Sequence, residues 1–185
     1  MITTITTPFD RETLNSLKSG DQVRINGIIY IARDAAHKKM IDLLSEGRSL
    51  PFDIKNQIIY YAGPCPAKPG KVIGSVGPTT SGRMDVYTPK LIELGLTGMI
   101  GKGERDTDVI RAMIRYGAVY FGATGGAGAL IARTVKSQEV VAFPELGAEA
   151  IRRIVVEEFP AIVVIDAFGN NLYAIGRDKY SEGKS

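Results

Sequence analysis

The feature that most constrains the fold is the alternation of short, largely apolar runs with segments whose apolar residues recur at helical spacing. The runs 97–100 and 118–121, for example, flank a helical pattern over 107–116. Such a strand–helix–strand rhythm favours parallel strands joined by helical crossovers. The chain has 185 residues, 44% of them apolar, which is enough for one domain with a sizeable core.

The same reasoning predicts the remaining elements. Further strands are expected at 22–32, 58–62, 71–76, 139–143, 162–165 and 172–175, and further helices at 35–46, 88–94 and 148–158. The last two strands flank Gly169-Asn170 and are expected to form a hairpin. We therefore predict a layered α/β domain over 1–185, with a largely parallel central sheet, some antiparallel pairing and a frayed tail at 180–185.

Charge and composition argue against several classes of protein. Lysine and arginine number 23 against 20 acidic residues, and they are scattered, so nucleic-acid binding has little support. Apolar runs such as 161–165 are far shorter than the roughly 20 residues that cross a bilayer. The N-terminus lacks the basic head and apolar core of a signal peptide, so a cytoplasmic location is expected.

The single cysteine, Cys65, limits the redox and metal chemistry of the chain. It permits no internal disulfide, and alone it cannot hold zinc or an iron–sulfur cluster, since both need several soft ligands. Any metal chemistry must therefore be supplied by another chain. Between Pro64 and Pro66, Cys65 itself is interpreted as an unreactive loop thiol.

The most informative segment is 77–85, with the sequence Gly-Pro-Thr-Thr-Ser-Gly-Arg-Met-Asp. It lies between a predicted strand and a predicted helix, where ligands bind in open α/β sheets. Its glycines, its three hydroxyls and Arg83 offer anion-binding amides, proton carriers and a carboxylate ligand together. The alternative is a capped turn with a solvated arginine, and composition alone does not separate the two.

Two further groups lie at predicted strand ends. Arg33 and His37 are one helical turn apart at a helix start, where an anion is favoured; the alternative is that Arg33 is a surface charge and His37 a helix-surface or interface residue. Lys102 lies between two glycines that permit close approach of a ligand, although such lysines are usually only solvated. The glycine-rich segment 122–129 is not interpreted as a nucleotide site, because it matches no clean fingerprint and is explained equally well by close packing.

Taken in order, these segments resemble one known family over nearly the whole chain. The segments are Arg33-Asp-Ala-Ala-His37, Gly63-Pro64, 77–85, Gly101-Lys-Gly103 and Thr124-Gly-Gly-Ala127. They resemble the C-terminal domain of class I fumarases, which also occurs as the β subunit of two-chain fumarases and L-tartrate dehydratases. The string 77–85 is the most specific part of this resemblance.

The resemblance implies a swivelling β/β/α three-layer domain, with a largely parallel central sheet and a smaller antiparallel sheet, and an active site at an interface. It also implies a 4Fe-4S cluster held by three cysteines of a larger α subunit, in keeping with the lone Cys65. The substrate would be a C4 dicarboxylate. For stoichiometry we expect two copies of each subunit, an α₂β₂ assembly.

By matched position, the resemblance implies that Arg33 and Arg83 bind substrate carboxylates, that Thr79 is the catalytic base and that Lys102 is a further active-site charge. His37 accompanies the motif and is included among the catalytic candidates. A threonine hydroxyl ionises far above neutral pH, so nearby positive charge would have to stabilise its alkoxide. The additional expected substrate contacts are Thr80 and Ser81.

The leading functional hypothesis is fumarate hydratase, which interconverts fumarate plus water and L-malate. L-tartrate dehydratase is the nearest alternative within the same family. From another class, the chain is a non-catalytic binding or scaffold domain that kept the fold. Only the first two hypotheses require Thr79 and Arg83 for turnover.

Overall fold

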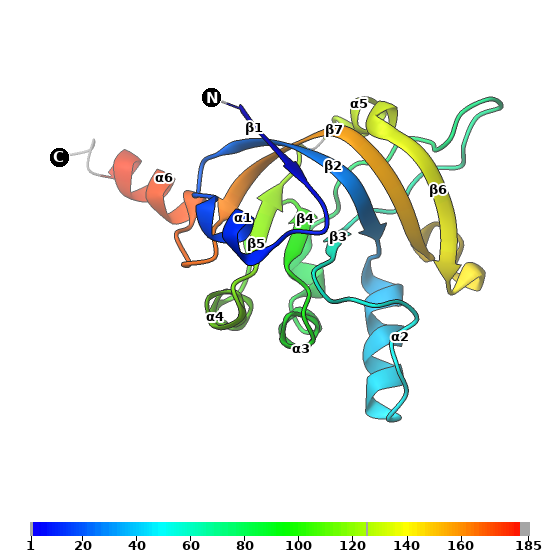
Figure 1. Cartoon of the computed structure of the whole chain (residues 1–185), viewed down its shortest axis with the longest axis horizontal. Coiled ribbons are helices and arrows are strands. Elements are labelled where there is room, and N and C mark those ends of the chain that lie inside the picture. Colours follow the sequence, from blue (N-terminus) through cyan, green and yellow to red (C-terminus); the bar gives the residue numbers. More distant parts are fainter. Residues whose placement is uncertain (1, 125, 182–185) are drawn as a thin grey trace.

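A computed structural model of the chain describes residues 2–124 and 126–181 (Figure 1). The strands are β1 (Ile2–Thr6), β2 (Gln22–Ile31), β3 (Ile58–Tyr60), β4 (Gly98–Gly101), β5 (Val119–Gly122), β6 (Val135–Ala142) and β7 (Ile151–Ile165). The helices are α1 (Arg11–Ser16), α2 (Asp34–Ser45), α3 (Thr88–Glu93), α4 (Thr107–Tyr116), α5 (Gly128–Thr134) and α6 (Leu172–Ser181), with short 3₁₀ turns η1 (Ser81–Met84) and η2 (Pro144–Glu149). Of the tail expected to fray, 182–185 lies outside the described residues.

The strands form one mixed sheet in the order β1-β2-β3-β4-β5-β7-β6. Strands β1 to β5 run parallel to one another, whereas β7 is antiparallel to β2, β5 and β6. Because β7 pairs with both β2 and β5, the strands β2, β3, β4, β5 and β7 close into a ring. The expected separate, smaller antiparallel sheet is therefore not found among the described residues, because the antiparallel pairs of β7 belong to the same sheet as the parallel ones.

Side chains alternate between two apolar cores along the parallel strands. In β3, Ile58 and Tyr60 join a core that includes buried residues of β2 and β7, while Ile59 joins a second core with buried residues of α2, α3 and α4. Those three helices lie together on one side of the strands (Figure 1). The parallel strands are thus covered on both faces. Strands buried in this way have nearly continuous apolar sequences instead of alternating ones.

Several predicted elements are confirmed. The strand at 22–32 and the helix at 35–46 appear as β2 and α2, and the helix at 107–116 is α4 with the predicted bounds. Asp106 caps α4 by accepting a hydrogen bond from Val109 N at 2.9 Å, and Gly117 ends it in the left-handed region at φ 72°. Among the described residues, no helix is long and apolar enough to span a membrane.

Three predictions of secondary structure were wrong. The expected helix 148–158 is mostly the strand β7, which is rich in β-branched residues and pairs with β2 at nine registered positions. The expected strand 172–175 is the start of α6, so the hairpin is replaced by a single bridge between Ile165 and Asn171. The expected strand 71–76 is irregular, although Ile73 and Val76 are buried.

Candidate functional site

The parallel strands bring their carboxyl ends to one edge of the sheet. Strand β2 ends immediately before Ala32 and Arg33, β3 before the segment 61–63, β4 before Lys102, and β5 before Ala123. Loops at the carboxyl ends of parallel strands are the usual place for a ligand in an α/β protein. The predicted site residues of distant segments therefore share one edge.

The segment 77–85 crosses this edge and is held to two of the strand ends. Thr79 N donates to Tyr61 O at 2.8 Å, and Ser81 N donates to Lys102 O at 2.9 Å. Thr80 and Lys102 pair as an isolated parallel bridge. This backbone pairing places Thr79 and Thr80 beside Lys102, as the sequence predicts for one site.

Two arginines and two carboxylates form an ion-pair cluster at the start of α2. Asp34 Oδ2 lies 3.1 Å from Arg33 Nε, and Asp34 Oδ1 lies 2.7 Å from Arg83 Nε. Glu149 Oε1 lies 3.2 Å from the same Arg33 Nε, and Glu149 Oε2 accepts a hydrogen bond from Ala35 N at 3.0 Å. Arg33 and Arg83 are thus brought together through one shared carboxylate.

The predicted site side chains differ in their access to solvent. Thr80, Arg83 and Lys102 are exposed, whereas Ser81 is fully buried. Ser81 Oγ lies 2.9 Å from the Tyr120 hydroxyl. Because the Ser81 side chain is fully buried, a substrate does not reach its hydroxyl in this conformation.

His37 lies beneath the backbone of Arg33 and is buried. Its Nδ1 is 2.9 Å from Arg33 O, and because a carbonyl oxygen only accepts, Nδ1 carries the proton. Burial lowers the pKa of His37 to about 4, so the ring is neutral at neutral pH. Nε2 has no hydrogen-bond partner among the described residues, and the ring makes an edge contact with Tyr61 at 5.3 Å.

A buried polar network that the sequence did not reveal lies under the site. Arg105 Nε is 2.7 Å from Asp85 Oδ1, Arg105 Nη2 donates to Thr88 Oγ1 at 3.1 Å, and the guanidinium lies over the rings of Tyr61 and Tyr120. Asp85 also accepts a hydrogen bond from Asp106 N at 2.7 Å. The network joins the end of segment 77–85 to the loop that carries Lys102. The position of Asp85 at the end of the motif was the only sequence signal for it.

The described residues do not fit an iron–sulfur cluster. Such clusters are held by several thiolates, and this chain has one cysteine, the exposed Cys65. Across the parts of the chain that the structure describes, no three histidine, cysteine or acidic side chains are grouped to hold a metal ion. A cluster would therefore need ligands from another chain.

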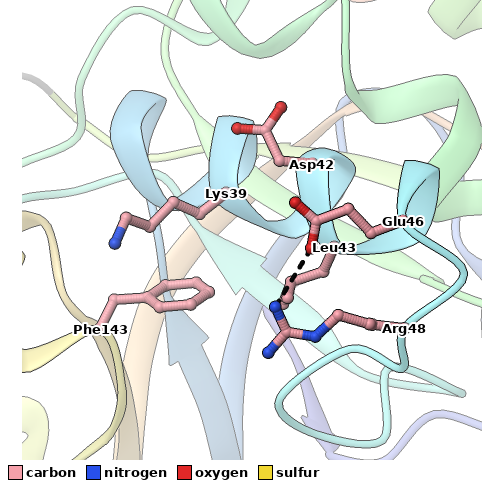
Figure 2. Close-up of a pocket in the computed structure, with 6 residues that line it drawn as sticks. All are labelled: Lys39, Asp42, Leu43, Glu46, Arg48 and Phe143. Carbon is pink, nitrogen blue, oxygen red and sulfur yellow. Dashed lines mark hydrogen bonds and ion pairs between the residues drawn. The ribbon is translucent and has the colours of Figure 1, made fainter.

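A pocket of about 330 Å³ lies elsewhere, between α2 and Phe143 (Figure 2). Its charged residues are paired, with Arg48 against Glu46 inside the pocket and Lys39 against Glu145 of η2. Lys39 Nζ also lies over the Phe143 ring at 5.1 Å. The pocket lies along α2 beyond the ion-pair cluster, and the Lys39 contacts help to hold η2 against this helix.

Comparison with known proteins places the chain among fumarase-type sequences. Residues 2–176 match the family described as Fumarase C-terminus. The chain is 40% identical over 166 residues to Fumarate hydratase 2 of Leishmania major and 43% identical over 154 residues to the aerobic class I fumarate hydratase of Escherichia coli K12. These alignments cover 89% and 82% of this chain but only 29% and 28% of those relatives.

A third relative is a chain of about the same length as this one. It is a Methanocaldococcus jannaschii protein provisionally named L(+)-tartrate dehydratase subunit beta, 41% identical over 169 residues. This alignment covers 88% of the chain and 87% of the relative. The same region thus occurs both within longer chains and in a relative of about its own length.

Proposed function

Because the chain belongs to the Fumarase C-terminus family, we propose that it is the smaller subunit of an iron–sulfur-dependent hydro-lyase. The leading candidate reaction is the interconversion of fumarate plus water and L-malate. The relatives support this class of reaction, since they include class I fumarate hydratases and a tartrate dehydratase subunit by name.

The observation that carries the proposal is the convergence of segment 77–85 with Lys102 and the arginine pair at one edge of the sheet. A C4 dicarboxylate has two negative charges, and Arg33 and Arg83 are suited to hold them because a guanidinium binds a carboxylate through two parallel hydrogen bonds. Arg83 and Lys102 are exposed and so accessible to a ligand, and Arg33 is about one-quarter exposed. Binding by both arginines would fix the orientation of the carbon skeleton.

In this proposal Thr79 moves the proton of the carbon next to the leaving hydroxyl. Its backbone is fixed at both ends by hydrogen bonds to Tyr61 and Lys102, which holds the side chain at a defined place. Positive charge from Lys102 and Arg83 would favour the ionised hydroxyl. Thr80 is a proposed substrate contact, and Ser81 and His37, both buried, would act on the site through the groups they support.

The cluster is proposed to be ligated by three cysteines of a larger α subunit, with the active site between the two chains. This division agrees with the single cysteine of this chain. It also agrees with the longer relatives, of which this chain matches under a third. A swivelling movement of the β/β/α domain against that partner, and an α₂β₂ stoichiometry, are part of the same proposal.

The experiment that tests the proposal is reconstitution of the chain with a cluster-bearing partner, followed by kinetics with fumarate, L-malate and L-tartrate. Turnover of fumarate and L-malate supports fumarate hydratase, and preference for tartrate supports L-tartrate dehydratase, the second candidate, to which the M. jannaschii relative points. A complex that stays fully active when Thr79 and Arg83 are both replaced would show a non-catalytic scaffold instead.

A further inference from the structure

We propose that Asp34 is a positioning residue: it holds the guanidinium groups of Arg33 and Arg83 in the relative position that lets both bind one substrate. Glu149 is a second anchor for Arg33. This inference rests on the proposed function, because it assigns the supports of the same carboxylate site. Neither residue is among the site residues expected from the sequence. Both are identified by the ion pairs at the start of α2.

The geometry assigns Asp34 a role that neither arginine could supply for itself. Its two carboxylate oxygens contact different arginines, Oδ2 at 3.1 Å from Arg33 and Oδ1 at 2.7 Å from Arg83. In both pairs the nearest guanidinium atom is Nε, which leaves the terminal Nη groups for a ligand carboxylate. Since Arg33 and Arg83 come from segments 50 residues apart, this shared carboxylate fixes their relative position.

Glu149 and Gly63 restrict Arg33 from two further elements. Glu149 pairs with Arg33 Nε at 3.2 Å and also binds the backbone amide of Ala35. A Cβ on Gly63 would lie 3.1 Å from Arg33 Nη1 and 3.2 Å from its Cδ, so the arginine side chain packs closely over this glycine. Arg33 is therefore held by α2, by η2 and by the loop after β3.

The side chains of this cluster are only partly exposed, which strengthens their mutual interaction. Asp34 and Glu149 are 27% and 28% exposed, against 52% for Arg83. Burial acts to raise the pKa of Asp34, but hydrogen bonds from its own backbone amide and from Arg33, together with the charge of both arginines, hold the pKa below its usual value. Asp34 is thus an anion at neutral pH and cancels part of the charge that attracts a dicarboxylate.

Asp34 orients the two arginines but also weakens the positive charge that attracts the substrate. Asp34→Asn should therefore affect kcat and KM differently in the reconstituted complex. Loss of the anchor lets the two arginines move, so kcat should fall about tenfold. Loss of a negative charge should leave KM unchanged or lower it, because the site becomes more positive. Asp42→Asn, on the exposed side of the same helix, is the matched control and should leave both constants near wild type.

Double variants separate positioning from a general effect on folding. If Asp34 acts through both arginines, its effect should not multiply with theirs. In Asp34→Asn combined with Arg33→Lys or with Arg83→Lys, the fold-loss of kcat should be at least threefold smaller than the product of the two single fold-losses. Glu149→Gln should show this non-additivity with Arg33→Lys only. The Glu149 series also tests the inference if Asp34→Asn does not fold.

A measurement on the chain without turnover provides an independent test. The Nε–Hε protons of Arg33 and Arg83, observed by NMR, should exchange with water at least threefold faster in Asp34→Asn, and only that of Arg33 should do so in Glu149→Gln. Unchanged exchange rates, or fully multiplicative kinetic effects in an active complex, would overturn this inference alone. A wild-type complex that is inactive on every dicarboxylate would overturn the proposed function, and the inference with it.

Discussion

At the scale of single residues, Thr79 has the most demanding of the proposed roles, because as the base its hydroxyl would have to exchange a proton that it holds tightly in water. Thr79→Val removes the hydroxyl at nearly constant volume. In the reconstituted complex kcat should fall on the order of 100-fold or more with little change in KM, the usual scale for loss of an acid–base group. Thr79→Ser keeps the hydroxyl and should retain most of the activity.

Exchange of the substrate C3 proton with deuterated solvent provides a second measurement for Thr79. It reports deprotonation even where another step limits turnover. Near-normal exchange in the Thr79→Val complex would remove Thr79 as the base and would assign the proton transfer to another group at the interface.

Arg83→Lys tests the carboxylate site by keeping the charge and removing the planar fork. Both constants should change, with KM raised and kcat lowered, because orientation of the dicarboxylate contributes to binding and to the transition state. Arg111→Lys is the matched control, since Arg111 is 75% exposed on α4. Equal kinetics for the two variants would mean that Arg83 does not bind the substrate.

His37 predicts a pH dependence of folding stability. Its pKa is lowered from 6.5 to about 4 by burial, so the unfolded chain binds the proton more readily than the folded one. The stabilisation is therefore complete above the unfolded pKa of 6.5 and is lost as the pH falls toward 4. Between about pH 7.5 and about pH 4.5, the free energy of unfolding should fall about 2 to 3 kcal/mol more in wild type than in His37→Gln.

Urea unfolding of both proteins at each pH measures this difference, and the carboxylates common to both cancel. Since His37 is the only histidine, no other imidazole contributes. Parallel profiles for the two proteins would show that His37 is exposed or already protonated in the folded state.

Some residues of the site were predictable from the sequence because they lie in one continuous motif or beside glycines at strand ends. The structure brings Thr79, Thr80 and Lys102 together as expected for a common site. Glu149 and Arg105 were not predictable, because their partners Ala35 and Asp85 lie 114 and 20 residues away in the sequence. In addition, nothing in the sequence around a charged residue shows that its side chain will be partly or fully buried. Such supports become visible only when the chain is folded.

At the scale of secondary-structure elements, β4 depends on glycine where it meets segment 77–85. A Cβ on Gly101 would lie 2.0 Å from Ser81 Oγ and 3.0 Å from the Tyr61 ring, in a fully buried place. Gly101→Ala should therefore lower the free energy of unfolding by about 1 to 3 kcal/mol, the usual cost of overpacking. It should also disturb the hydrogen bond between Ser81 and Tyr120, because Ser81 Oγ is the atom that the new methyl group would displace.

Gly176→Ala is the control for that substitution, measured by urea unfolding. A Cβ on Gly176 meets no atom within 4 Å, and the residue lies in α6. Alanine there should leave the stability unchanged or raise it by about 0.5 to 1 kcal/mol. Equal stability of both alanine variants would show that the strand and the motif do not pack as closely as described.

The elements that the sequence predicted well are those whose pattern is local. Helix α4 has an N-cap at Asp106, a helical apolar period and a glycine end, and all three are visible within a dozen residues. Strand β7 was mistaken for a helix in its first half because Ile151, Ile154 and Val155 recur at the i, i+3, i+4 spacing of a helix. Its pairing with β2, more than 100 residues earlier, decides in favour of a strand, and no local pattern contains that partner.

At the scale of the whole molecule, the proposed division of labour predicts that the isolated chain binds no cluster. After anaerobic reconstitution with iron and sulfide, the purified chain should contain no stoichiometric cluster, as measured by metal analysis and absorbance. In the complex with its partner, Cys65→Ser should leave iron content and turnover near wild type, because Cys65 is exposed and is a single thiol. Loss of the cluster in that variant alone would contradict the assignment of all its ligands to the partner.

The closure of the strands through β7 has a consequence for how the chain reaches its native state. Strands β2 and β7 pair across more than 120 residues, so this contact carries a large loop-closure entropy. Until residues 151–165 have left the ribosome, β2 and β5 both lack a partner that they have in the ring. Folding should therefore be slow for a domain of this size, and the ring should close only once residues 151–165 are available rather than progressively along the chain. During that interval the unpaired strands are the segments most exposed to aggregation, which makes the last third of the chain decisive for its solubility in the cell.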